Sequence, residues 1–292
     1  MAVHDQSYAA WTGAYTSRWA RIRAIVGMEL VQAFSNLWLL LLLILAFMIV
    51  SGWLIILFFA ATQQVLPPFA IGNRLYRDGF YNLGVANLFF FSMILMLLAA
   101  TMGASLIARD RRHNALVMYF SRAITRLDYL AGKFLALSAF LLTATFGPGL
   151  LLWLVVTGMG PERLTFGQRL GDLGAIALHS LILVLPVSAM VLAFSSFTRR
   201  TYVAAILWVT FFFASWIFST VLQGTLKEDW PKLISWMSLA AHLGDLCYPV
   251  RGLSGKRVLD CGWVEPFSIL GSVTVLSLLL VWRRLRSVEA LE

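Results

Sequence analysis

The chain has 292 residues, of which 60% are hydrophobic and only 13% are charged, and its formal net charge is +9. A soluble domain of this length is much less apolar, so the composition argues against a soluble enzyme and indicates a membrane protein. The excess of basic residues is also only weak evidence for nucleic-acid binding. It lies mostly in segments predicted on the cytoplasmic side, where the positive-inside rule and anionic lipid headgroups account for it.

Residues 1–36 are predicted to form a cytoplasmic arm that precedes the first apolar run. The stretch between Ala14 and Phe34 has a helical pattern, which predicts an amphipathic helix lying in the inner membrane interface with Trp19 as its anchor. Arg23 falls close to the apolar face, so a disordered basic tail is the alternative. The apolar face of the predicted helix consists of Trp19, Ile22, Val26 and Leu30.

Residues 37–292 contain six apolar runs, each close to the roughly 20 residues needed to cross a bilayer, and these predict an all-α polytopic domain. The apolar cores of these runs contain no Asp, Glu, Lys or Arg. This absence disfavours a transporter driven by protons or ions, which needs ionisable groups within the membrane. The predicted spans are Leu37–Ala61, Leu83–Ala108, Phe134–Thr157, Gly174–Phe197, Tyr202–Leu222 and Pro266–Trp282.

The segment 108–133, between the second and third predicted spans, is strongly basic and contains the apolar patch Ala115–Phe120. A basic connection of this kind belongs on the cytoplasmic side, which places both termini there too and predicts a multi-pass protein of the bacterial inner (plasma) membrane. The apolar patch predicts a surface that another protein binds. The basic residues of the segment are Arg109, Arg111, Arg112, Arg122, Arg126 and Lys133.

The segment 223–265 is predicted on the outer side, where short interfacial or re-entrant helices fit its mixed composition. Both cysteines, Cys247 and Cys261, fall in it. The outer side of a bacterial envelope is oxidising, so a disulfide is expected, with two separate thiols as the alternative. Ser254 lies in a Gly-Leu-Ser-Gly run within this polar loop, and turn formation explains that run better than a hydrolase nucleophile does.

The sequence contains no phosphate-binding loop, because the Gly-Lys pairs at Gly132 and Gly255 lack the upstream glycine and the following Ser or Thr. It also contains no metal-ligand cluster. We therefore expect no catalytic residue, metal or cofactor in this chain, and any energy for transport must come from a partner.

Three stretches resemble the membrane-spanning permease subunits of ABC-2 type transporters. They are Gly103–Arg112, Tyr119–Lys133 and Leu192–Arg200, and the resemblance covers essentially the whole chain. The stretch Tyr119–Lys133 is the most specific, since it follows the family's S-R-P-I-x-R-x-x-Y-L-x-G-K run except at Ala123, where the family commonly has Pro. In the first stretch, Asp110 stands where Glu is more usual.

The resemblance implies a coupling helix, within roughly Asp110–Arg122, that docks on a separate ATPase subunit. Two ATPase copies, which carry ATP and Mg, and a second permease chain, identical or homologous, would complete the complex. Apolar side chains would fill a pocket and arginines would pair with acids around it; the alternative is a basic loop that only sets orientation. The expected coupling residues are Asp110, Arg111, Arg112, Leu116, Val117, Phe120, Arg122 and Arg126.

The resemblance also implies that spans two and five line the substrate path. Their many aromatic residues suit an amphiphilic or lipid-like substrate, which makes an exporter the expected function. The alternative is a membrane scaffold or assembly factor that recruits a cytoplasmic partner without transport, and an ABC ATPase encoded by a neighbouring gene would favour the exporter. The expected polar residues of the path are Asn87, Ser92, Thr101, Thr210, Ser215 and Ser219.

Overall fold

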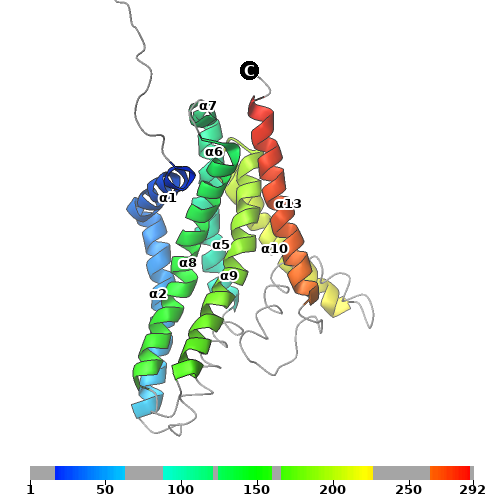
Figure 1. Ribbon diagram of the computed structural model, residues 1–292. Helices are drawn as coiled ribbons and strands as arrows, with labels where there is room; N and C mark the ends of the chain where they lie inside the picture. Colours follow the sequence, from blue (N-terminus) through cyan, green and yellow to red (C-terminus); the bar gives the residue numbers. More distant parts are fainter. Residues whose placement is uncertain (1–16, 63–87, 121–123, 160–165, 226–263, 290–292) are drawn as a thin grey trace, which may run out of the picture.

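The computed structural model describes residues 17–62, 88–120, 124–159, 166–225 and 264–289, and every regular element in these ranges is a helix. The predicted all-α architecture is therefore confirmed. Figure 1 shows the helices as an elongated bundle. Their bounds are α1 Arg18–Ser35, α2 Leu37–Thr62, α5 Leu88–Leu98, the π-helical η2 Ala99–Gly103, α6 Ala104–Arg112, α7 Ala115–Phe120, α8 Arg126–Met159, α9 Phe166–Phe197, α10 Thr201–Thr225 and α13 Val264–Glu289.

Five stretches of the described chain are long and apolar enough to cross a membrane, and the number rises to six if α1 and the start of α2 count together. Those two helices meet at 81°, so α1 lies almost perpendicular to α2. This is the arrangement expected of an interfacial helix that precedes a span. The five stretches are Met93–Arg112, Arg126–Leu151, Leu173–Phe197, Thr201–Phe218 and Phe267–Arg286.

The segment 108–133, predicted as a connecting loop, is helical over most of its described length. The span formed by α5, η2 and α6 continues to Arg112, and α8 begins at Arg126, before the predicted start of span three at Phe134. Charged residues at these positions can be helical because they lie at the end of the bundle, beyond the most apolar part of each span. Between them, α7 forms the tip of the bundle (Figure 1).

The α5–η2–α6 span lies at the centre of the bundle, whereas α10 and α13 lie at its edge. The apolar window of the central span is 72% buried inside the protein, compared with 11% for α10 and 22% for α13. The central span packs against α8, α9 and α10. Gly103 permits this packing, because a Cβ there would lie 2.4 Å from Val191 Cγ1 of α9 and 2.9 Å from Leu137 Cδ2 of α8.

Two local signals set the position of α7. Asn114, which follows α6, has a φ of +51°; Asn tolerates this left-handed conformation better than most residues do, and it ends the helix with a sharp turn. At the start of α8, the backbone N–H of Asp128 donates to Thr125 Oγ1 (3.2 Å) and that of Thr125 donates to Asp128 Oδ2 (3.4 Å). This reciprocal pair is a capping box, and it fixes where α8 begins.

Candidate coupling site at the α7 end of the bundle

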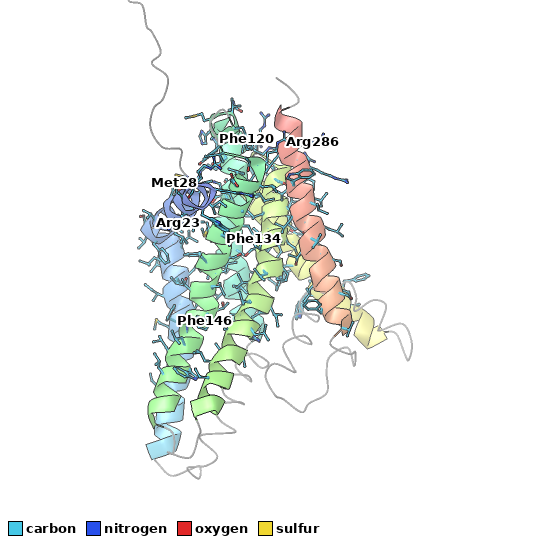
Figure 2. All side chains as sticks on the ribbon, in the orientation of Figure 1. Arg23, Met28, Phe120, Phe134, Phe146 and Arg286 are labelled. Atoms are coloured by element: carbon cyan, nitrogen blue, oxygen red, sulfur yellow. The ribbon has the colours of Figure 1, made fainter. Side chains whose placement is uncertain are left out.

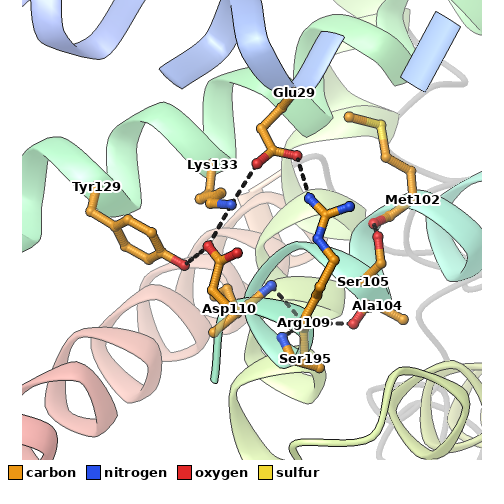
Figure 3. A network of polar contacts seen from close by, with 11 residues as sticks. Glu29, Met102, Ala104, Ser105, Arg109, Asp110, Tyr129, Lys133 and Ser195 are labelled. Carbon is orange, nitrogen blue, oxygen red and sulfur yellow. Dashed lines mark hydrogen bonds and ion pairs between the residues drawn. The ribbon is translucent and has the colours of Figure 1, made fainter. Parts of the chain in front are cut away.

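Lys133, on α8, is fully buried and is paired with two carboxylates from other helices (Figure 3). Its Nζ donates to Glu29 Oε1 of α1 at 2.6 Å and to Asp110 Oδ2 of α6 at 2.7 Å. Both carboxylates are themselves buried. A lysine can be kept charged in such a place only by partners of this kind, because desolvation of an unpaired ammonium costs several kcal/mol.

Two further groups, Arg109 and Tyr129, complete what we call the Lys133 network, which consists of Glu29, Arg109, Asp110, Tyr129 and Lys133. The Tyr129 hydroxyl donates to Asp110 Oδ2 at 2.8 Å, and Arg109 Nη2 lies 3.4 Å from Glu29 Oε2. The ammonium of Lys133 lies 5.4 Å from the centre of the Tyr129 ring. Two cations and two anions balance, which offsets much of the cost of burying them.

The network connects α7 to the bundle through aromatic rings. The ring of Tyr119 lies 5.3 Å from that of Tyr129 and 5.9 Å from the ammonium of Lys133, and the ring of Phe120 lies 6.0 Å from that of Tyr129. Burial raises the pKa of the Tyr119 phenol, although Lys133 acts in the opposite direction. The phenol is therefore neutral at physiological pH. Helix α7 thus packs against the charge-balanced Lys133 network, whose members come from α1, α6 and α8.

A second ion cluster connects the beginnings of α1 and α8. The side chain of Asp128 is fully buried; it accepts a hydrogen bond from Arg18 Nε, and its Oδ2 lies 3.4 Å from Arg21 Nη2. The same carboxylate forms the capping box with Thr125. Since Gly132, one turn further along α8, allows Ile25 of α1 to lie against the helix backbone, α1 and α8 are held together by both charge and close packing.

Ser195, near the end of α9, binds the backbone of α6 directly (Figure 3). Its Oγ accepts from the N–H groups of Ile107 (3.1 Å) and Ala108 (3.0 Å) and donates to the carbonyl of Ala104 (2.8 Å). In an uninterrupted α-helix the Ala108 N–H would bind the Ala104 carbonyl itself. The serine hydroxyl bonds to both of these groups just after the π-helical η2, and it fastens α6 to α9 at that point.

The exposed apolar face of α7 consists of Val117 and Met118, whose side chains are 45% and 66% exposed. Leu116 is only 2% exposed because it packs in the protein's own core, and Phe120 packs partly against Tyr129. The sequence predicted a docking face formed by Leu116, Val117 and Phe120. In this structure only Val117 of the three points outward, and it is accompanied by Met118, which is not among the predicted residues.

The charged residues predicted for coupling are divided between the interior and the surface. Asp110 is in the Lys133 network, and Arg111 donates from Nη1 to the carbonyl of Ser196. Arg112 is exposed and Arg126 is partly buried, while Arg122 lies outside the described residues.

Of the residues predicted for the substrate path, Thr101 and Thr210 are exposed on η2 and α10, which pack against each other. Ser215 is buried, and its hydroxyl donates to the carbonyl of Phe212 in its own helix. The structure does not describe Asn87 or the side chains of Ser92 and Ser219. The two cysteines and Ser254 also lie outside the described residues.

Sequence reasoning missed the roles of Glu29, Tyr129, Lys133 and Ser195. One signal was available: Tyr129 and Lys133 are four residues apart, so they share a helical face once α8 is extended to Arg126. Glu29 gave a second, weaker signal, as the one acid between Ala14 and Phe34. Their partners could not be read from the sequence, because Glu29 and Lys133 are separated by 104 positions.

Comparison with known proteins places the sequence in a family. The profile of the ABC-2 family transporter proteins matches residues 23–234, a range that includes the whole Lys133 network, Ser195 and α7. No curated protein matches the chain. The members of that family are transmembrane subunits that associate with an ABC ATPase and are not themselves the ATPase. The chain therefore belongs to the ABC-2 transporter family, as a membrane permease subunit of an ABC transporter.

Proposed function

We propose that this permease is the membrane half of an exporter, driven by a separate ABC ATPase that binds α7 as a coupling helix. The observation that carries the proposal is the exposure of Val117 and Met118 at the tip of the bundle. Two exposed apolar side chains on one short helix suit insertion into a pocket of a partner protein. The exposed Arg112, just before α7, is available to pair with acids around such a pocket.

The contacts below α7 support a mechanical role for it. A push on α7 would reach the rings of Tyr119 and Tyr129 first, then the Lys133 network, and so α1, α6 and α8 together. The Ser195 contacts would carry the same displacement from α6 to α9. We therefore assign Asp110 to this internal connection, where it positions α6, and assign direct contact with the ATPase to the exposed residues of α7. Movement of these helices as one unit is the kind of rigid-body step that alternating access requires.

The substrate is proposed to be amphiphilic or lipid-like and to move along the faces of α5, η2 and α10, at the interface with a second permease chain, identical or homologous. Support comes from α10, which exposes large apolar side chains along most of its length. The hydroxyl of Thr101 is satisfied by the carbonyls of Leu97 and Leu98 in its own helix, so it adds little polarity to this face. Two ATPase copies and cytoplasmic termini in the bacterial inner membrane complete the proposed assembly.

The test is copurification of the full chain from native membranes, with the ATPase identified by mass spectrometry and by ATP hydrolysis. We expect Met118→Asp, and separately Val117→Asp, to reduce the recovered ATPase at least tenfold, because a buried unpaired carboxylate opposes insertion into an apolar pocket. Gln32→Glu, at an exposed position on α1, is the control that adds the same charge and should retain the ATPase.

Two results would count against the proposal. Full recovery of the ATPase with both α7 variants would remove the coupling role of this helix. Recovery of a cytoplasmic partner without any ATPase would favour the scaffold alternative. The transport step is tested separately, by reconstituting the complex in liposomes and measuring ATP-dependent movement of fluorescent lipid analogues.

A further inference from the structure

Arginines from three elements converge at the α7 end of the bundle, on the side where α9, α10 and α13 meet. Arg111 of α6 donates to the carbonyl of Ser196 at the end of α9, Arg284 of α13 lies over the ring of Phe197, and Arg199 follows two residues later in the turn before α10. We call these three arginines the arginine cluster. Arg286, two residues further along α13, lies at the same end of the bundle as Phe120 of α7 (Figure 2). Like charges that approach one another repel, and a bound anion would relieve this repulsion.

The described carboxylates are paired with other cations. The carboxylate side chains that the structure describes are those of Glu29, Asp110 and Asp128. Their ion pairs go to Lys133, Arg109, Arg18 and Arg21, all on α1, α6 and α8. Within the described part of the chain, neither Arg111 nor Arg199 is in an ion pair; Arg111 makes its hydrogen bond to the neutral carbonyl of Ser196. An anion from outside the described residues can therefore bind there.

Two of the three arginines are fixed in place before any ligand arrives. The bond to the Ser196 carbonyl anchors the guanidinium of Arg111, and the guanidinium of Arg284 lies 4.7 Å from the centre of the Phe197 ring. Such anchoring lowers the entropy lost on binding, and the planar guanidinium group suits the paired oxygens of a phosphate.

The surroundings indicate that the anion belongs to a lipid. The arginines stand at the ends of α10 and α13, the two least buried candidate spans. Large apolar side chains are exposed beside them: Phe197 is 43% exposed, Tyr202 56% and Leu280 44%. A ligand that fits this surface has a negatively charged head next to hydrocarbon chains. An acidic protein surface would match the arginines but would leave the apolar faces of α10 and α13 uncovered.

We propose that the arginine cluster binds the phosphate of an anionic glycerophospholipid whose acyl chains lie along α10 and α13. Arg111, Arg199 and Arg284 hold the phosphodiester by charge-assisted hydrogen bonds, and the lipid occupies the membrane surface at the α7 end of the bundle. This site is separate from α7, and it does not depend on the proposed coupling or export function.

The experiment is native mass spectrometry of the full chain in a neutral detergent, titrated with phosphatidylglycerol and, in parallel, with phosphatidylcholine. We expect tighter binding of phosphatidylglycerol, and Arg199→Gln should weaken it about five- to tenfold. Arg199→Lys should retain most of the affinity, since the charge remains. Arg23→Gln is the matched control, because Arg23 is an exposed arginine on α1, away from the cluster (Figure 2). Circular dichroism checks that each variant keeps its helical content.

Three results would overturn the proposal. The first is equal binding of the two lipids. The second is an effect of Arg199→Gln no larger than that of Arg23→Gln. The third is complete competition by millimolar inorganic phosphate, which would make the cluster a site for a free anion. Loss of ATPase copurification in Arg199→Gln, with unchanged lipid binding, would assign the cluster to an acidic protein surface and would also exclude the lipid.

Discussion

Replacement of Lys133 by methionine removes the one cation that two buried carboxylates share. The ammonium lies 2.6 Å from Glu29 Oε1 and 2.7 Å from Asp110 Oδ2, and the lysine side chain is 0% exposed. Methionine fills a similar volume but cannot neutralise charge. Glu29 would keep only the longer contact with Arg109, at 3.4 Å, and Asp110 would keep the hydroxyl of Tyr129.

The expected loss follows from the asymmetry between breaking and replacing a buried ion pair. Removing one partner typically costs about 3–5 kcal/mol, because the remaining charge stays buried and uncompensated. We expect a loss of this size in the free energy of unfolding for Lys133→Met. The assay is equilibrium unfolding in mixed micelles of increasing SDS content, followed by the fluorescence of the chain's 11 tryptophans.

Two comparisons make the result interpretable. Arg23→Met, at an exposed position on α1, should change the free energy of unfolding by no more than about 0.5 kcal/mol. The triple variant Glu29→Gln, Asp110→Asn, Lys133→Met removes all three charges and should recover at least half of the loss. The reasoning is refuted if Lys133→Met stays within about 1 kcal/mol of the wild type, or if the triple variant is less stable than the single one.

Two further substitutions test the packing of the central span. Ser195→Ala removes three hydrogen bonds to the backbone of α6 and should lower the free energy of unfolding by about 1–3 kcal/mol. Ser196→Ala removes a hydroxyl that bonds only within its own helix, to Ala193, and should cost clearly less. Equal losses would contradict the bridging role. Gly103→Ala should lower the free energy of unfolding by about 1–3 kcal/mol through overpacking. Gly27→Ala, with nothing within 4 Å of the added Cβ, is the control and should be neutral or slightly stabilising. Both variants are measured by the same unfolding assay.

Hydropathy and charge made the architecture predictable, since both are properties of local stretches of chain. A run of apolar residues must be helical in a bilayer because its backbone has no other hydrogen-bond partners there. The family resemblance could be read for the same reason, because the run Tyr119–Lys133 is continuous in sequence. The angle between α1 and α2 also agrees with the predicted interfacial arm, whose apolar periodicity ends just before Leu37.

The orientation of individual side chains was less predictable. A helical pattern tells which residues share a face, as Leu116 and Phe120 do on α7, but it does not tell whether that face meets a partner or the protein's own core. In the structure that face packs inward and Met118 points outward. A sequence pattern does not separate these cases, because both surfaces favour the same apolar residue types.

The order of residues along the chain is enough to predict a helical membrane permease with a short apolar helix between basic segments, because bilayer insertion depends on local composition. The buried network of Glu29, Asp110 and Lys133, and the contact by which Ser195 fastens α9 to α6, follow only from the folded arrangement of the helices. Glu29 and Lys133 are 104 positions apart, and Ser195 is 91 positions from Ala104. Contacts over such distances depend on how each helix is rotated and placed against its neighbours, which is decided by the packing of the whole bundle, including the close approach of α8 and α9 to Gly103, which has no Cβ.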